Sequence, residues 1–179
     1  AFFDPFGNAV HSINSYEIVG EDIIITGAGP IGLISVAICK FMGARNIVIT
    51  DINDYRLSLA QRLGATKTIN TKKESIKDCF SELDIKHGFD VGLEMSGHPQ
   101  AFNEMLSCIY HGGKIVLLGL LPNGTSINWD NIIFKGLSIK GVYGREMYET
   151  WYKMDQLIKA GLDLNKIITH KFSISNFNE

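Results

Sequence analysis

The sequence lacks the patterns of a metal-binding, membrane-spanning or nucleic-acid-binding protein. Its three cysteines, Cys39, Cys79 and Cys108, stand far apart, so no C-x-x-C pair predicts a zinc knot or a redox dithiol. The five histidines show no ligand spacing, and we expect no metal site within the chain. No apolar run of about 18 residues predicts a transmembrane helix. With a net charge of −2 and no cluster of Lys and Arg, we expect neither a nucleic-acid nor a membrane partner.

Repeats, low-complexity tracts and long Gly/Ser linkers are also absent, which argues against a solenoid or a flexible multi-domain chain. What is present is the composition of an ordinary globular domain, with 179 residues, 45% hydrophobic and 20% charged. A chain of this length can form one domain with its own core. Because the cysteines lie in apolar helical stretches, we expect buried thiols in a reducing compartment, and therefore a cytoplasmic protein.

A glycine-rich turn between two apolar runs is the most informative motif. The run 22–26 leads into Gly27-Ala28-Gly29-Pro30-Ile31-Gly32, and a later apolar run ends on Asp51, 19 residues after the third glycine. Strand, G-x-G-x-x-G turn, helix, strand and terminal acid together are typical of a dinucleotide-binding unit. In that unit Gly27 permits the tight turn, Gly29 lets a diphosphate approach the backbone, and Gly32 lets the helix pack on the sheet. A glycine turn without a ligand is the alternative.

The residues around the turn predict which dinucleotide binds. Pro30 opens a helix whose first N–H groups and positive dipole end attract a diphosphate. Asp51 can accept hydrogen bonds from the adenosine ribose and would repel a 2′-phosphate, which favours NAD over NADP. Arg56 is a cation in the first turn of the next helix, where the dipole disfavours it, so we expect it to stack on adenine. The alternatives are a helix cap at Asp51, a job that Asn53 fits better, and a surface pairing of Arg56 with Asp54.

Six apolar runs alternate with helical stretches along the chain. Four of the runs are short and lack polar alternation, as expected for strands buried on both faces of a sheet. The expected strands lie near 22–26, 46–50, 68–70, 91–94, 114–118 and 137–141, and the expected helices at 4–13, 30–41, 54–63, 75–83, 99–108 and 149–159. This order predicts an α/β Rossmann fold, a doubly wound six-stranded parallel sheet in the order 3-2-1-4-5-6 with helices on both faces.

The segments after the fourth, fifth and sixth strands are further candidates for cofactor contacts. In this fold a dinucleotide lies across the carboxyl ends of the strands, and small residues there leave room for it. Ordinary turn chemistry is the alternative. The candidates are Met95, Ser96, Leu118, Gly119, Leu120, Val142 and Tyr143.

A separate helix is expected before the first strand. Asp4 can cap it, and Pro5 can occupy its first position. The chain opens on apolar residues rather than on methionine, and it closes within one turn of a candidate helix cap at Ser175. We therefore expect a segment of a longer protein.

Longer strings give a more specific resemblance. Residues 3–11, 92–97, 134–154 and 168–174 resemble the corresponding strings of the bacterial L-threonine 3-dehydrogenase family, and the resemblance runs without a gap over essentially the whole chain. That family belongs to the zinc-dependent medium-chain dehydrogenases, which the fingerprint and the strand ends also resemble. The resemblance implies the cofactor domain of an enzyme that oxidises the 3-hydroxyl of L-threonine to 2-amino-3-oxobutanoate and reduces NAD.

The resemblance also implies roles for individual residues. Asp4 would stand beside a catalytic zinc and relay the substrate proton. The zinc ligands of the family lie in a preceding catalytic domain, so residues 1–18 would link to that domain, residues 19–161 would bind NAD, and residues 162–179 would return to it. The implied NAD contacts are Ile31, Asp51, Arg56, Leu118, Gly119, Leu120, Val142 and Tyr143.

Activity and assembly follow from the same resemblance. Zinc polarises the substrate hydroxyl, so without the zinc-binding domain we expect this chain to bind NAD weakly and to lack dehydrogenase activity. The complete enzyme is expected to be a homotetramer, assembled partly through an edge strand near 137–142. Two other interpretations remain open: the cofactor domain of another zinc-dependent polyol or alcohol dehydrogenase, and a non-catalytic nucleotide-sensing Rossmann module.

Overall fold

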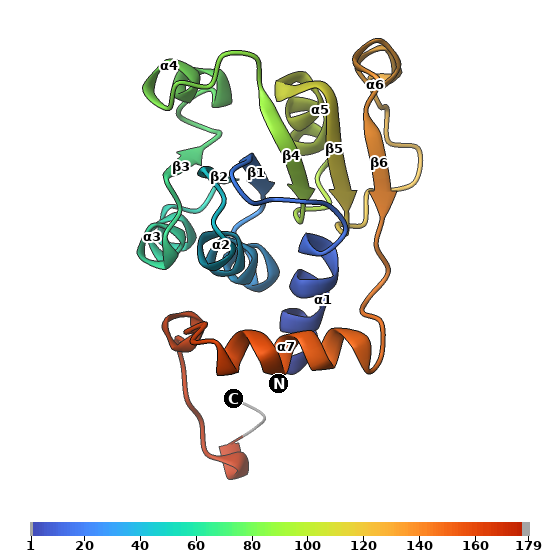
Figure 1. Ribbon diagram of the computed structural model, residues 1–179. Helices are drawn as coiled ribbons and strands as arrows, with labels where there is room; N and C mark the ends of the chain where they lie inside the picture. Colours follow the sequence, from blue (N-terminus) through green and yellow to red (C-terminus); the bar gives the residue numbers. More distant parts are fainter. Residues whose placement is uncertain (1, 177–179) are drawn as a thin grey trace.

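The computed structural model describes residues 2–176 and confirms the six-stranded parallel sheet (Figure 1). The observed order, β3-β2-β1-β4-β5-β6, is the predicted order of a doubly wound Rossmann sheet. Every neighbouring pair of strands is parallel. The strands are β1 (Asp22–Thr26), β2 (Asn46–Asp51), β3 (Lys67–Asn70), β4 (Phe89–Glu94), β5 (Ile109–Leu117) and β6 (Ser138–Gly141).

Helices cover both faces of the sheet. Those that share one core cluster are α1 (Phe3–Ile13), α2 (Pro30–Met42), α3 (Asp54–Leu63) and α7 (Glu149–Lys159). The other face carries η1 (Ile76–Asp78), α4 (Cys79–Glu82), α5 (Pro99–Cys108) and α6 (Trp129–Lys135). The short turns η2 (Asn165–Ile167) and η3 (Ile174–Asn176) follow α7. In Figure 1 the arrows of β4, β5 and β6 point toward the edge of the sheet at which α1 and α7 lie.

Side-chain alternation along each strand divides the core between the two faces. In β1, Ile23 and Ile25 belong to the cluster under α1 and α2, whereas Ile24 belongs to the cluster under α5. All three side chains are fully buried, and burying each contributes about 2 kcal/mol. Because both faces are apolar, the strand shows no polar alternation in the sequence.

The helix ends on the β2 side follow the expected capping chemistry. Asn53 caps α3, since its side chain accepts a hydrogen bond from the N–H of Arg56 at 3.2 Å. Gly43 and Gly64 end α2 and α3 with left-handed backbone conformations, which glycine adopts without strain. These caps place β2 and β3 at fixed distances from the glycine turn.

The structure corrects one predicted helix, the start of one predicted strand and one predicted helix cap. The segment 75–83 forms η1 and the short α4 instead of one helix, because only Ile76 and Cys79 are buried there and a longer helix would have little apolar contact. Strand β5 begins at Ile109 rather than near residue 114. Asp4 does not cap the first helix, since α1 already begins at Phe3 and has no side-chain cap.

Helix α6 is absent from the prediction although its end signals are present. Asn128 caps it by accepting from the N–H of Asn131 at 3.3 Å, and Gly136 ends it in a left-handed conformation. The helix has seven residues and none is fully buried, so its apolar face of Trp129, Ile132 and Ile133 spans little more than one turn, which is too short to predict a helix.

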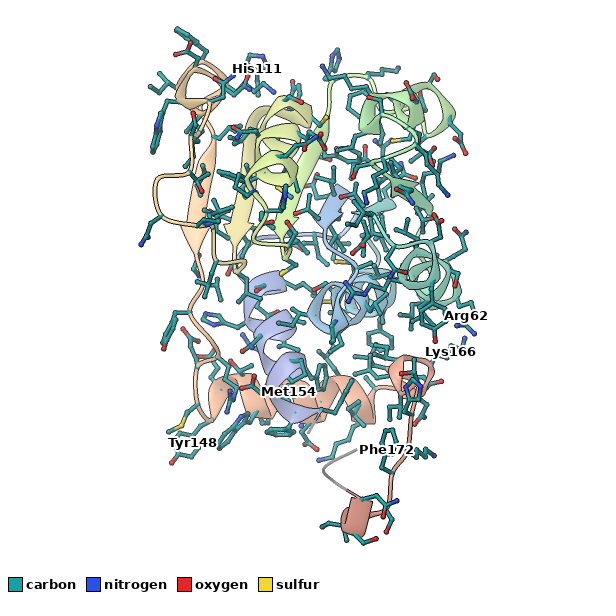
Figure 2. All side chains as sticks on the ribbon, turned by 180° about the vertical axis from the view of Figure 1, so that it is seen from behind. Arg62, His111, Tyr148, Met154, Lys166 and Phe172 are labelled. Carbon is teal, nitrogen blue, oxygen red and sulfur yellow. The ribbon has the colours of Figure 1, made fainter. Side chains whose placement is uncertain are left out.

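Helix α7 crosses α1 at the carboxyl edge of the sheet. Met154 is 1% exposed and lies at this contact, as Figure 2 shows from behind. A Cβ atom on Gly7 would come within 2.6 Å of Arg145 Cδ, so glycine allows α1 to approach the segment that precedes α7. None of the helices within residues 2–176 has the length and hydropathy needed to cross a bilayer.

Candidate functional site

A cleft of about 450 Å³ opens at the carboxyl ends of β1, β2 and β4. This is the point where the strand order reverses, and open α/β sheets bind their ligands there. The predicted site residues that line it are Gly27, Gly29, Asp51, Arg56, Met95 and Ser96. The sequence analysis missed the other lining residues, Thr50, Ile52, Thr71, Lys72, His98, Gln100, Ala101 and Glu104. Gln100, Ala101 and Glu104 lie on one face of α5. Once the end of β4 was assigned, their helical spacing could have predicted that this face borders the cleft.

Two glycines of the turn are required by the chain itself. Gly27 has a φ of +89°, and its N–H donates to the carbonyl of Thr50 at 2.8 Å. A Cβ atom there would also lie 3.0 Å from the backbone of Ser96. On Gly32 a Cβ atom would come within 1.9 Å of the Gly27 carbonyl oxygen, so only glycine lets α2 start this close to the turn.

Gly29, which lies between these two glycines in the turn, has no such requirement. Its φ is −70°, which any residue adopts, and a Cβ atom there would meet nothing within 4 Å. It is the N-cap of α2, Pro30 follows it at the first helical position, and the first turn carries no acidic side chain. The N–H groups of Ile31 and Gly32 have no partner four residues back in the helix. This helix end therefore presents donors and a positive dipole end to open space, which suits an anion.

Asp51 is fixed at the rim of the cleft by backbone N–H groups. Its Oδ2 accepts from Ala28 N at 2.7 Å, which ties the end of β2 to the glycine turn. Its Oδ1 accepts from Ile52 N at 2.7 Å and from Asn53 N at 2.9 Å. A carboxylate has about four acceptor directions, so capacity for a ligand hydroxyl remains.

Arg56 lines the cleft beside Asp51 and does not take the alternative pairing with Asp54. Within residues 2–176, Asp54 pairs with Lys73 at 2.7 Å and accepts from Asn70 Nδ2 at 2.6 Å. The hydrogen bonds from Lys73 and then Asn70 lower the pKa of the Asp54 carboxyl. With its acidic neighbour engaged elsewhere, the Arg56 guanidinium remains available to the cleft.

Glu94 is a further residue of this region that the sequence analysis missed. It ends β4, is fully buried, and its carboxylate accepts from Thr26 Oγ1 at 3.2 Å and from the N–H groups of Ser96 and Gly97, both at 3.0 Å. A Cβ atom on Gly119 would lie 2.2 Å from Glu94 Oε2, so the turn after β5 covers the carboxylate. The sequence signal that could have predicted Glu94 as a site residue is its position as an acid at the end of a largely apolar strand.

The remaining predicted contacts lie beside the cleft, along the same edge of the sheet. The N–H groups of Leu118 and Gly119 donate to the Glu94 carbonyl at 3.1 and 3.0 Å, and Val142 N donates to the Leu117 carbonyl at 2.8 Å. Leu120 and Tyr143 are 88% and 98% exposed. The structure therefore places these residues along one edge of the sheet, with Leu120 and Tyr143 exposed and Val142 buried.

Asp4 is placed away from the cleft residues. It lies in the first turn of α1, where its carboxylate pairs with Arg145 from the segment after β6 and accepts from Asn8 Nδ2 at 3.3 Å. The Arg145 guanidinium also lies 5.9 Å from the centroid of the Trp151 ring. The pair joins segments that are 141 residues apart, so neither partner could be inferred from local pattern.

The described part of the chain offers no metal site. Within residues 2–176, no group of three His, Cys, Asp or Glu side chains could hold a metal ion. The cysteines are unpaired and buried as predicted, and burial raises the pKa of the Cys39 thiol to about 12. A buried thiol that resists ionisation is a poor ligand.

Comparison with known proteins gives consistent relatives. The family model for zinc-binding dehydrogenases matches residues 30–160. The L-threonine 3-dehydrogenase of Xanthomonas campestris pv. campestris is 58% identical over 179 residues, which is 100% of this chain and 52% of that protein. The L-threonine 3-dehydrogenase of Stenotrophomonas maltophilia is 57% identical with the same coverage. The chain therefore spans about half the length of the curated relatives that it matches.

A solved structure of a dehydrogenase is also similar to this chain. A short chain alcohol dehydrogenase from Escherichia coli, in complex with the cofactor NADH, superposes with a TM-score of 0.85. The sequences are 26% identical, and the match covers 96% of this chain and 51% of that chain.

Proposed function

This chain belongs to the zinc-binding dehydrogenase family, and from that membership we propose that it forms the NAD-binding domain of an L-threonine 3-dehydrogenase. The complete enzyme would oxidise the 3-hydroxyl of L-threonine, reduce NAD and yield 2-amino-3-oxobutanoate. The identity of 58% to an L-threonine 3-dehydrogenase over the full chain supports this substrate.

The open space beside Gly29 is the observation that carries the proposal. Gly27 and Gly32 are explained by contacts within the chain, whereas no contact within the chain requires a glycine at position 29, and the space its side chain would fill is open to a ligand. The neighbouring helix end offers N–H donors and no acid. A diphosphate satisfies both conditions, since it needs close backbone approach and donors.

The other predicted residues have complementary roles in this proposal. Asp51 accepts from the adenosine ribose, Arg56 stacks on adenine, and Met95 and Ser96 line the path of the cofactor toward β4. The residues that follow β5 and β6 are proposed to border the nicotinamide half: Leu118, Gly119, Leu120, Val142 and Tyr143. NAD supplies the hydride acceptor, and zinc, held by residues outside this chain, supplies the Lewis acid. Asp4 would relay the substrate proton.

The domain arrangement and the assembly are also proposals. Residues 1–18 connect to a catalytic domain, residues 19–161 bind NAD, and residues 162–179 return to it, although Ala1 and residues 177–179 lie outside the described residues. A homotetramer would use β6, which is an edge strand of the sheet and, within residues 2–176, pairs with β5 alone. The three buried thiols support a cytoplasmic location.

The test is cofactor binding to the full-length enzyme by calorimetry. The wild type should bind NADH more tightly than NADPH. The Asp51→Ala variant should bind NADH roughly a hundredfold more weakly than the wild type, since the substitution removes the hydrogen-bond acceptor for the ribose. Asp54→Ala is the matched control, an acid three residues away whose loss should leave the affinity unchanged. Because Asp51 also holds the glycine turn, urea unfolding of Asp51→Ala must accompany the binding data.

A wild type that prefers NADPH, or an Asp51→Ala variant with unchanged affinity for NADH, would contradict the proposal. The substrate is tested separately, by comparing L-threonine with polyols and simple alcohols on the full-length enzyme. This chain alone should form no NADH from threonine, and vigorous turnover by it would contradict the assignment of zinc chemistry to another domain.

A further inference from the structure

Glu94 carries a buried charge that its surroundings do not neutralise. Its carboxylate is fully buried, and within residues 2–176 no ion pair involves it. All its partners are donors, namely two backbone N–H groups and the hydroxyls of Thr26 and Ser96. This is the environment of a carboxylate rather than of a carboxylic acid. Burying such a group without a cation is costly, so its position calls for an explanation.

The position of Glu94 is the end of β4, next to the strand β1 that bears the glycine turn. Its donors Ser96 and Gly97 form the turn that borders the cleft, and Gly119 covers its Oε2. A dinucleotide that follows the fold crosses this point on its way from the adenosine side to the nicotinamide side. The charge is therefore held by rigid contacts beneath the cofactor's path and cannot turn away from it.

We propose that Glu94 makes the site discriminate between the two redox states of the cofactor, favouring oxidised NAD over NADH. The nicotinamide ring is cationic in the oxidised form and neutral in the reduced form. A fixed negative charge in a medium of low dielectric attracts the cationic ring and has no comparable effect on the neutral one. The inference rests on the proposed function and adds a residue that determines which cofactor form is preferred.

The experiment measures the dissociation constants of oxidised NAD and NADH separately, by calorimetry on the full-length enzyme and on Glu94→Gln. Glutamine keeps the shape and removes the charge. We expect the affinity for oxidised NAD to fall roughly tenfold more than that for NADH, a shift in their ratio that a purely structural role would not produce. An equal loss for both forms would overturn the inference.

Two control variants separate charge from geometry. Asp90→Asn removes the same charge from the opposite end of the same strand and should leave the ratio unchanged. Glu94→Asp keeps the charge and shortens the side chain, so it should lower the affinity for oxidised NAD and for NADH by the same factor. If Glu94→Gln does not fold, Glu94→Met removes the charge at similar side-chain volume: a ratio of affinities shifted toward NADH supports the inference, and an unchanged ratio overturns it. A wild type that binds neither form would instead refute the proposed function.

Discussion

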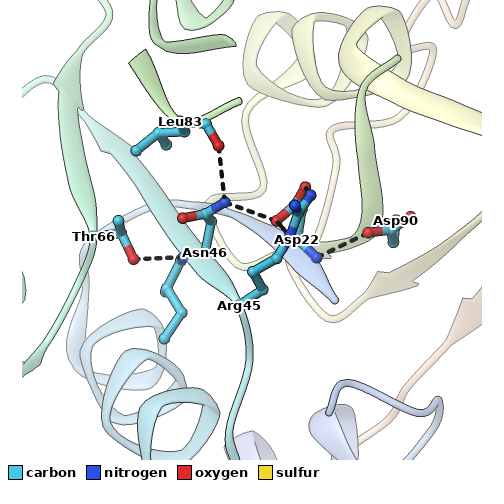
Figure 3. A network of polar contacts seen from close by, with 7 residues as sticks. Asp22, Arg45, Asn46, Thr66, Leu83 and Asp90 are labelled. Atoms are coloured by element: carbon cyan, nitrogen blue, oxygen red, sulfur yellow. Dashed lines mark hydrogen bonds and ion pairs between the residues drawn. The ribbon is translucent and has the colours of Figure 1, made fainter. Parts of the chain in front are cut away.

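The two ends of the parallel sheet hold their acidic side chains in different ways. At the amino end, Asp22 is 2% exposed and its carboxylate accepts from Arg45 Nε and Asn46 Nδ2, both at 2.9 Å (Figure 3). The same network continues from Asp22 N to Asp90 and from Asn46 Nδ2 to the Leu83 carbonyl. The buried charge is neutralised within the chain, and the hydrogen bond that Arg45 donates to Asp22 raises the pKa of the Arg45 guanidinium.

At the carboxyl end, Asp51 and Glu94 are held by backbone N–H groups and hydroxyls instead of cations. The reason is geometric, since strands of a parallel sheet end in turns and helix N-termini, which present free N–H donors at that edge. Such donors fix a carboxylate in place and leave its charge largely uncompensated. The amino end therefore uses its buried acid to stabilise the fold, whereas the carboxyl end keeps fixed acidic groups that suit a ligand.

The largest effect is expected from Gly32→Ala, which attacks the carboxyl end through its backbone. The added Cβ would overlap the Gly27 carbonyl, so the turn must move or unfold. We expect a loss of about 3 kcal/mol in the free energy of unfolding, measured in urea, together with the loss of NADH binding. Wild-type stability in this variant would mean that the turn is not as tightly packed as described.

The next effect is expected at the amino end from Asp22→Ala. Removing the buried carboxylate leaves Arg45 and Asn46 without their hydrogen-bond acceptor, but Arg45 is half exposed and can bond to water instead. We therefore expect a loss of about 2 kcal/mol in the free energy of unfolding with NADH affinity changed less than about twofold. A large loss of NADH affinity in a folded variant would erase the distinction between the two ends.

A smaller and opposite pattern is expected from Gly29→Ala. Its backbone conformation and the open space permit alanine, so the free energy of unfolding should stay within about 0.5 kcal/mol of wild type. The methyl group would occupy the space proposed for the diphosphate, and NADH affinity should fall roughly tenfold by calorimetry. Equal binding by both proteins would show that the glycine serves no ligand.

The smallest effect concerns pH at the amino end. Burial and then the neighbouring Asp90 raise the pKa of the Glu21 carboxyl above its ordinary value of 4.5. Below pH 4.5 the carboxyl is protonated in both folded and unfolded chains, so Glu21→Gln should change nothing. Once the pH rises through the raised pKa, ionisation costs stability, and Glu21→Gln should be about 0.5 kcal/mol more stable than wild type at pH 7. Urea denaturation of both proteins at pH 4 and pH 7 measures this difference in the free energy of unfolding. A difference that is larger at pH 4 than at pH 7 would contradict the prediction.

The sequence was sufficient wherever the contacts are local. The turn from Gly27 to Gly32, the capping of α3 by Asn53 and the strand order all follow from short-range patterns that the structure confirms. It was insufficient for α6, which has seven residues and none of them fully buried, and for Glu94, whose hydrogen-bond donors come from the ends of both β1 and β4. The pairing of Asp4 with Arg145 escaped prediction for a similar reason, because it joins distant segments.

By itself, the sequence determined that the chain alternates strand and helix and that a glycine turn and an acid stand at the ends of the first two strands. These features depend on backbone freedom, apolar runs and capping side chains, which act over a few residues. Only the tertiary structure decided that, of the three glycines in the turn, Gly29 faces open space, and that two acids at one end of the sheet have no cationic partner within residues 2–176. Both facts depend on which residues distant in sequence come to lie beside each other, and neither periodicity nor composition records that.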